Sequence, residues 1–200
     1  MPGRSVRSGP VDFDVYTALL GHRAVFVRGR LDRAAGNSAA AQLLMLAQAD
    51  AQRPIELYVD SADGELTAAL GVYDVMRSLS APVSTTCLGR AAGPSVVVVA
   101  GGAAGQRFAL PSARFSLRLP AASLDQALPA EQLQVHAREA RRLHARLAEV
   151  LSQDTGRSIE QVAHDLDHGE WMSAAEAQAY GLVDAVVQRR PPAEDPLLSP

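Results

Sequence analysis

Short apolar runs of strand length alternate with stretches of helical spacing along most of this chain. The strand-like runs lie at 24–27, 55–59, 83–88, 107–110, 114–119 and 182–187. Helical spacing is present at 38–50, 66–79, 94–101 and 129–153, and further helices are predicted to start at 158 and 173. This alternation predicts an α/β fold with mainly parallel strand pairing. In such folds the chemistry usually lies at the carboxyl ends of the strands, which here are the predicted loops 60–64 and 89–94.

Proline, glycine and serine residues mark where the predicted helices begin and end. Pro94 suits the first position of a helix, where its missing N–H is not needed. Gly156 is expected to end the long helix, and Gly181 the last one. Ser158 and Ser173 are each followed within three residues by a glutamate, which is typical of a helix N-cap.

The length and charge of the chain limit its organisation and its partners. A length of 200 residues suits one domain with a single core. We expect this domain to span 12–188, between a flexible N-terminal segment at 1–11 and a disordered, Pro-rich tail at 189–200. The net charge of −3 gives no general reason to bind nucleic acid or an anionic membrane.

The only cysteine and the apolar runs bear on the compartment. Cys87 lies in an apolar segment, where a small buried side chain is expected, and it allows no internal disulfide. The first ten residues lack the apolar core of a signal peptide. The apolar run at 96–100 is far shorter than the roughly 20 residues that span a bilayer. We therefore predict a cytoplasmic protein without a membrane anchor.

Eight blocks in order resemble the ClpP family, the proteolytic subunits of ATP-dependent Clp proteases. They are DVYTALL at 14–20, IELYVDSADG at 55–64, VSTTCLGRAA at 83–92, RFALPSAR at 107–114, HARE at 136–139, TGRS at 155–158, WMSAAEA at 171–177 and YGLVD at 180–184. The resemblance runs from about residue 12 to 188 and implies a crotonase-like α/β fold of repeated β-α units. It also implies rings of seven subunits stacked in pairs around a chamber, with the protruding helix at 129–153 forming contacts between rings.

A serine peptidase needs a nucleophile, a base and an acid that orients the base. The family's serine follows Ala-Ala at a strand-to-helix turn, and the corresponding segment here reads GRAAGPS at 89–95, so Gly93 takes its place. Ser95 lies about 200° further around a helix, so its hydroxyl should point elsewhere. At the position of the family's base stands Arg118, whose guanidinium stays protonated and cannot accept a proton. A looser alignment at 167–173 puts Gly169 at the position of the acid.

The residues that resemble the oxyanion hole also depart from the family pattern. The two backbone donors correspond to Gly64 and to Pro94, and a proline has no N–H. Asp63 stands where the family has glycine, and its charge would oppose a developing negative charge nearby.

These departures predict a non-catalytic subunit, like the inactive paralogues of this family, with a structural or regulatory role in a Clp protease complex. Its expected partners are ClpP paralogues or further copies of itself, in rings of seven. Tyr58 matches one aromatic residue of the family's docking pocket for a Clp ATPase, while Glu56 replaces another, so docking is expected to be weakened or selective. We see no cluster of metal ligands and expect no cofactor.

Two alternatives stay open. The chain could be an active peptidase with a relocated nucleophile, Ser95 or Ser61, although a Ser–Lys pair is excluded because all 19 basic residues are arginine. It could also be a free-standing homo-oligomeric scaffold.

Overall fold

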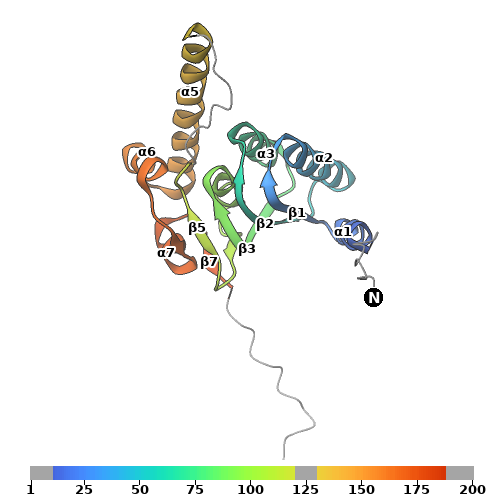
Figure 1. Ribbon diagram of the computed structural model, residues 1–200. Coiled ribbons are helices and arrows are strands. Elements are labelled where there is room, and N and C mark those ends of the chain that lie inside the picture. Colours follow the sequence, from blue (N-terminus) through green and yellow to red (C-terminus); the bar gives the residue numbers. More distant parts are fainter. Residues whose placement is uncertain (1–10, 120–129, 188–200) are drawn as a thin grey trace, which may run out of the picture.

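The computed structural model describes residues 11–119 and 130–187, which form an α/β fold (Figure 1). Its strands are β1 (Ala24–Leu31), β2 (Ile55–Gly64), β3 (Val83–Ala92), β4 (Arg107–Ala109), β5 (Arg114–Ser116), β6 (Met172–Ser173) and β7 (Ala185–Val186). Its helices are α1 (Val11–Gly21), α2 (Arg33–Ala49), α3 (Leu66–Ser78), α4 (Val96–Ala100), α5 (Ala130–Thr155), α6 (Ile159–His168) and α7 (Ala174–Tyr180), with a short 3₁₀ turn, η1 (Gly93–Ser95), before α4. The predicted flexible ends lie outside the described residues, apart from Val11 at the start of α1.

The strands form one sheet in the order β1-β2-β3-β4-β7, and these neighbours are all parallel. β5 pairs with the carboxyl end of β3, beyond the part that β4 covers, and β6 joins β5 in the only antiparallel pair of the described residues. The prediction of an α/β fold with mainly parallel pairing is therefore confirmed.

One face of the sheet is closed and the other is partly open. Val25, Val27, Leu57 and Val59 point into the core and are almost fully buried, beneath helices that include α2 and α4. On the opposite face α1 packs against β1, but Tyr58 of β2 is only partly covered. Parallel sheets are normally covered on both faces, so this face leaves room for a partner.

The helix boundaries follow the capping residues. Ser158 accepts a hydrogen bond from the N–H of Gln161, and Ser173 forms a capping box with Glu176, which confirms both predicted N-caps. Gly156 and Gly181 have positive φ values of 72° and 99°, and they directly follow or cap the helices they were predicted to end. Helix α5 rises clear of the body in Figure 1, and only its last turns are buried in the core.

The segments predicted as loops at 60–64 and 89–92 belong instead to β2 and β3. β1 reaches Leu31, further than predicted, and its end pairs with Gly64. Partners on adjacent strands satisfy the backbone groups there, and this outweighs the turn preference of the local sequence. A Cβ atom at Gly64 would lie only 2.6 Å from the carbonyl oxygen of Leu31, so the close approach of these strands requires glycine.

Arg107 joins four elements where β4 begins. Its Nε and Nη2 atoms donate to the carboxylate of Asp184, just before β7, at 3.0 and 2.5 Å. Its Nη1 atom donates to the carbonyls of Asp154 in α5 (2.8 Å) and of Gly181 after α7 (2.9 Å). The guanidinium therefore fixes the base of α5 and the end of α7 to the edge of the sheet.

Candidate functional site

The turn at the end of β3 is where the family resemblance puts a nucleophile. β3 ends at Ala92 and the chain enters η1 and then α4 through Gly93, whose φ is 56°. This left-handed conformation is unfavourable for residues with a Cβ atom. Gly93 and Pro94 are buried, and the position offers no side-chain group that could attack a substrate.

The two serines considered as relocated nucleophiles are both engaged. The hydroxyl of Ser95 accepts a hydrogen bond from the N–H of Ala92 (3.0 Å) and donates to the carbonyl of Ser61 (2.6 Å), with the Ala92 carbonyl also in reach at 3.0 Å. The Ser61 hydroxyl donates to the carbonyl of Asp63 at 3.0 Å. Both side chains are buried, with 0% and 1% exposure, so neither hydroxyl faces solvent. Ser95 instead links the end of β3 to β2.

We expect Ser95→Ala to leave hydrolysis of fluorogenic peptides unchanged but to lower the free energy of unfolding by about 1–3 kcal/mol. The loss follows from leaving the Ala92 N–H and the Ser61 carbonyl without this partner in a buried place. Urea denaturation measures the stability, and Ser78→Ala, at an exposed helix end, is the matched control. A peptide turnover that disappears in Ser95→Ala would instead identify Ser95 as a nucleophile.

The positions of the family's base and acid face a common cleft. Arg118 and Gly169 both line a cleft of about 540 Å³ between the strand β5 and the segment joining α6 to β6. Gly93 is not among its lining residues, so the structure brings together two of the three triad positions around this space. A Cβ atom at Gly169 would lie 2.3 Å from the carbonyl oxygen of Asp165, so this position has no room for any side chain.

The two positions that the family resemblance assigns to the oxyanion donors, Gly64 and Pro94, differ in what their backbones offer. Pro94 carries no N–H. The N–H of Gly64 is present, but it donates to the Oδ1 atom of Asp63 at 2.7 Å. Arg30 of β1 forms an ion pair with the Oδ2 atom of Asp63, opposite which it lies in the sheet register. The carboxylate of this chain therefore occupies the donor that the family resemblance assigns to an oxyanion.

The ion pair of Arg30 with Asp63 is not among the predictions from the sequence. We expected Asp63 to disfavour negative charge, but we did not expect a cation to hold it in place. The signal was present in the sequence, because Arg30 and Asp63 pair in register once β1 and β2 are extended to their full lengths. The predicted strand ends at residue 27, before Arg30, so it does not place Arg30 opposite Asp63.

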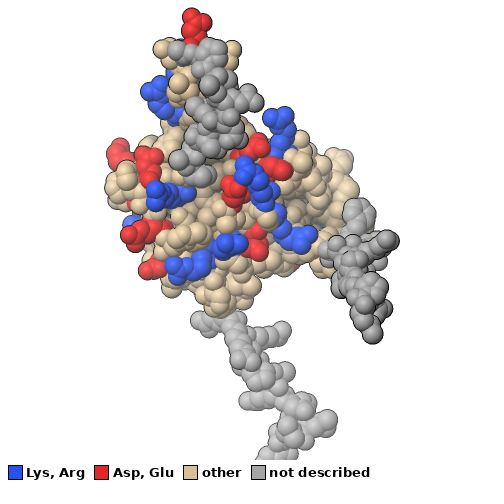
Figure 2. Space-filling view, in the orientation of Figure 1, with Lys and Arg blue, Asp and Glu red and all other residues tan. Residues whose placement is uncertain are grey.

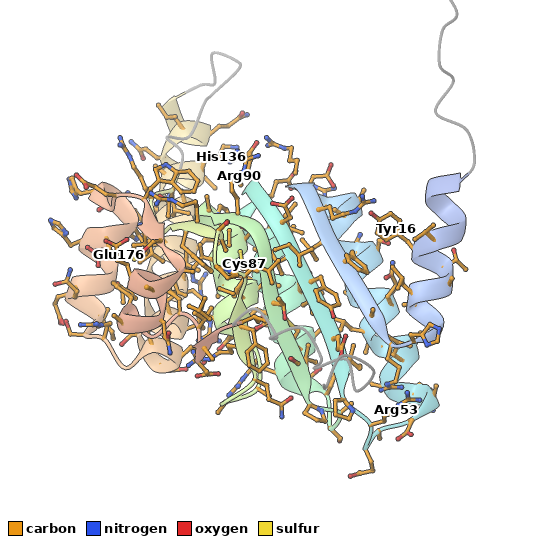
Figure 3. All side chains as sticks on the ribbon, turned by 90° about the horizontal axis from the view of Figure 1, so that it is seen from below. Tyr16, Arg53, Cys87, Arg90, His136 and Glu176 are labelled. Carbon is orange, nitrogen blue, oxygen red and sulfur yellow. The ribbon has the colours of Figure 1, made fainter. Side chains whose placement is uncertain are left out.

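Other groups near the sheet have no features of a catalytic centre. Cys87 is fully buried, and this burial raises the pKa of its thiol to about 12, so it stays protonated at neutral pH (Figure 3). Among residues 11–119 and 130–187 we find no group of three or more His, Cys, Asp or Glu side chains placed to hold a metal ion. Over the same ranges, no helix combines the length and the apolar character needed to cross a membrane.

A second cleft lies at the edge strand β1, beside the residue predicted to bind a partner. Tyr58 stacks on Phe26 with ring centroids 5.0 Å apart, and Tyr16 of α1 meets Phe26 edge-on at 5.1 Å. Tyr58 also donates a hydrogen bond to Glu56 at 2.6 Å, and this bond raises the pKa of Tyr58 to about 12. The guanidinium of Arg28 lies 3.8 Å from the centre of the Tyr16 ring.

This cleft, of about 520 Å³, is lined by Tyr16, Thr17, Leu20, Ala24, Phe26, Arg28 and Gln42. Figure 3 shows Tyr16 on α1, facing the sheet at this edge. Tyr58 is thus part of an aromatic cluster next to the cleft, although its own side chain is not among the lining residues. Its neighbour Glu56 makes one wall of the cluster polar.

Together, the parallel sheet, the buried turn into α4 and the protruding α5 define an α/β domain of the ClpP type. The family model for Clp protease matches residues 7–190. The chain therefore belongs to the Clp protease family, and the predicted resemblance to ClpP is confirmed.

Proposed function

We propose that this chain is a non-catalytic ClpP-like subunit with a structural or regulatory role in a Clp protease complex. One observation carries the proposal: at the turn after β3 the chain has Gly93 followed by Pro94, so a side-chain nucleophile and a backbone donor are both missing. The occupied N–H of Gly64 supports it further, since Asp63 holds the other donor. Arg118, as a permanent cation, cannot replace a basic histidine.

Surfaces left open in the single chain support assembly into rings. In α5 the residues from 131 to 142 are all exposed, and they include Leu133 and Val135 at 41% and 57%. The open face of the sheet adds a second uncovered region. Exposed apolar side chains on a helix that stands clear of the body favour burial against other subunits.

A second part of the proposal concerns the docking of a Clp ATPase. The aromatic cluster around Tyr58 offers an apolar contact, but Glu56 ties up the Tyr58 hydroxyl and adds a charge. We propose weakened or selective docking there. We also propose a reducing compartment such as the cytoplasm, since a single cysteine allows no internal disulfide.

Native mass spectrometry of the tagged protein, purified from its own host, tests the assembly. We expect complexes of seven or fourteen subunits in which this chain is combined with catalytic paralogues. Pure rings of this chain would favour the free-standing scaffold, and a monomer would contradict the proposed role. A fluorogenic peptide assay of the pure chain tests the chemistry, because turnover would contradict a non-catalytic subunit.

A further inference from the structure

In β5 and the two residues after it, the side chains are divided between the core and the cleft at the positions that the family resemblance assigns to the base and the acid. Phe115 and Leu117 point inward and are 0% and 1% exposed. Arg114 and Ser116 of β5 line the cleft, and Arg118, two residues beyond the strand, lines it as well, which continues the two-residue alternation of the strand. The sequence RFSLR therefore places two guanidinium groups on one wall of the same opening.

The opposite wall comes from the segment between α6 and β6. It contributes Gly169, Glu170 and Trp171, and His168, the last residue of α6, adjoins them. The indole of Trp171 is unusually open for so large an apolar side chain, at 47% exposure. Gly169 adds no side chain, so the space between the two walls stays free.

The two arginines of the cleft differ in what they already bind. Arg114 donates to the carbonyl of Trp171 at 3.5 Å. Hydrogen bonds from Ser173 lower the pKa of Glu176, and the charge of Arg114 adds to this effect. Arg118 makes no hydrogen bond or ion pair with any of the residues that the structure describes. Glu170 is the single acid among the lining residues and leaves the cleft with an excess of positive charge.

We propose that this cleft binds carboxylate groups of peptides, with Arg118 as the anchor and Trp171 as the adjoining apolar surface. A guanidinium presents a planar pair of donors that matches a carboxylate, and an indole face accepts a neighbouring side chain. The shared chemistry is a carboxylate, carried either by an Asp or Glu side chain or by a peptide C-terminus. The inference rests on the proposed function in one respect, namely that a bound peptide stays uncut.

The charge pattern around the cleft makes this recognition local. Figure 2 shows arginine and acidic side chains interspersed over the face in view, without a broad area of one sign. A general attraction for anions is therefore not expected, and binding should depend on Arg118 itself. Because exposed charges are screened, binding should weaken with rising salt.

Trp171 is the only tryptophan of the chain, so its fluorescence reports directly on the cleft. The probes for side-chain carboxylates are acetyl-tetraglutamate amide and its glutamine counterpart. The probes for a terminal carboxylate are acetyl-tetraalanine and its amide. We expect a saturable fluorescence change with at least one carboxylate probe and none with its neutral partner, and the responding pair identifies the source.

Variants of matched charge test the anchor. Arg118→Gln should weaken binding of the responding probe by about tenfold or more, as expected when a charge-assisted hydrogen bond is lost. Arg53→Gln removes the same charge from the amino end of β2, which Figure 3 shows far from the carboxyl ends of the strands near Arg90, and should change binding less than twofold. Glu170→Gln should strengthen binding.

Equal affinities of wild type and Arg118→Gln, or no saturable change with any carboxylate probe, would overturn the inference. Neither result would contradict the proposed non-catalytic role, because both concern only the binding of carboxylates. Mass spectrometry of the probe after the titration separates the two questions, because a cleaved peptide would contradict the proposed function while leaving carboxylate binding in place. Since Arg118 is exposed and without partners among the described residues, its replacement should not disturb folding, and urea denaturation checks this.

Discussion

A triple variant that restores the family's triad, Gly93→Ser with Arg118→His and Gly169→Asp, will hydrolyse fluorogenic peptides at no more than about one hundredth of the rate of an active Clp protease subunit. Loss of a single oxyanion donor costs about 10²–10³ in rate, and the position that the family resemblance assigns to one donor is Pro94, which has no N–H. The second donor, the N–H of Gly64, is held by the Asp63 carboxylate. Side-chain groups alone therefore do not rebuild the site.

The backbone also opposes two of the three restored residues. Gly93 has a φ of 56°, where a serine costs roughly 1–2 kcal/mol. At Gly169 any Cβ atom would collide with the carbonyl of Asp165, so the end of α6 must shift before an aspartate fits. An aspartate placed by a shifted helix end would not be held where a base requires it.

The matched comparison adds Pro94→Met and Asp63→Gly to the triple variant. These changes supply one backbone N–H and release the other from Asp63. The variant with all five substitutions should therefore hydrolyse the peptide about 10² times faster than the triple variant, or more. Both rates are measured with the same fluorogenic peptide, beside an active family member. Substantial activity of the triple variant alone would show that the Gly64 and Pro94 positions do not limit the chemistry.

Arg107→Met will lower the free energy of unfolding by about 3–5 kcal/mol, the largest loss we expect from a single substitution. The side chain of Arg107 is 12% exposed, and its removal leaves the partly buried carboxylate of Asp184 without its cation. It also removes the donors to the carbonyls of Asp154 and Gly181. Urea denaturation of the variant and the wild type measures the difference.

Arg30→Gln is the control for this effect, because it breaks an ion pair whose side chains are 59% and 51% exposed. Its cost should stay below about 1 kcal/mol. A loss of less than 1 kcal/mol in Arg107→Met would mean that the junction does not hold the fold together.

The stability supplied by Arg107 should also depend on pH. Burial raises the pKa of Asp184, but its bonds to Arg107 outweigh this and hold the pKa below the ordinary value of 3.8. The ionised pair therefore stabilises the fold above pH 3.8, and its contribution is lost as the pH falls through the lower pKa of the folded state. The difference in the free energy of unfolding between the wild type and Arg107→Met should therefore become smaller in acid.

The sequence predicted those parts of the fold that local chemistry decides. The helix ends at Gly156 and Gly181 and the N-caps at Ser158 and Ser173 follow from the conformations and hydrogen bonds of single residues. The alternation of apolar runs was enough to predict where the strands with buried apolar side chains lie in the sequence. These signals act within a few residues, so they can be read without knowing the neighbours in space.

The parts that it did not predict depend on distant residues. Helix α1 has almost no apolar periodicity, and its place is set by contact with β1. The ends of β2 and β3 have the composition of turns, but pairing with other strands keeps them extended. The Asp63 carboxylate, which accepts from the Gly64 N–H, also pairs with Arg30, 33 positions before it in the sequence. The hydrogen bond of Ser95 to Ser61 joins η1 to β2 across 34 positions, so it could not be predicted from the local sequence.

Helix α5 is anchored to the body of the protein at its C-terminal end only. Its exposed part, from 131 to 142, projects from the body, whereas Leu147, Val150 and Leu151 are buried and Arg107 grips the carbonyl of Asp154 near its last residue. A sideways force on the projecting part produces a torque that grows with the length of that part. This torque acts on the anchored end, where the Arg107 guanidinium also binds Asp184 and Gly181. Movement of the projecting part is therefore transmitted through Arg107 to β4 and to the segment before β7.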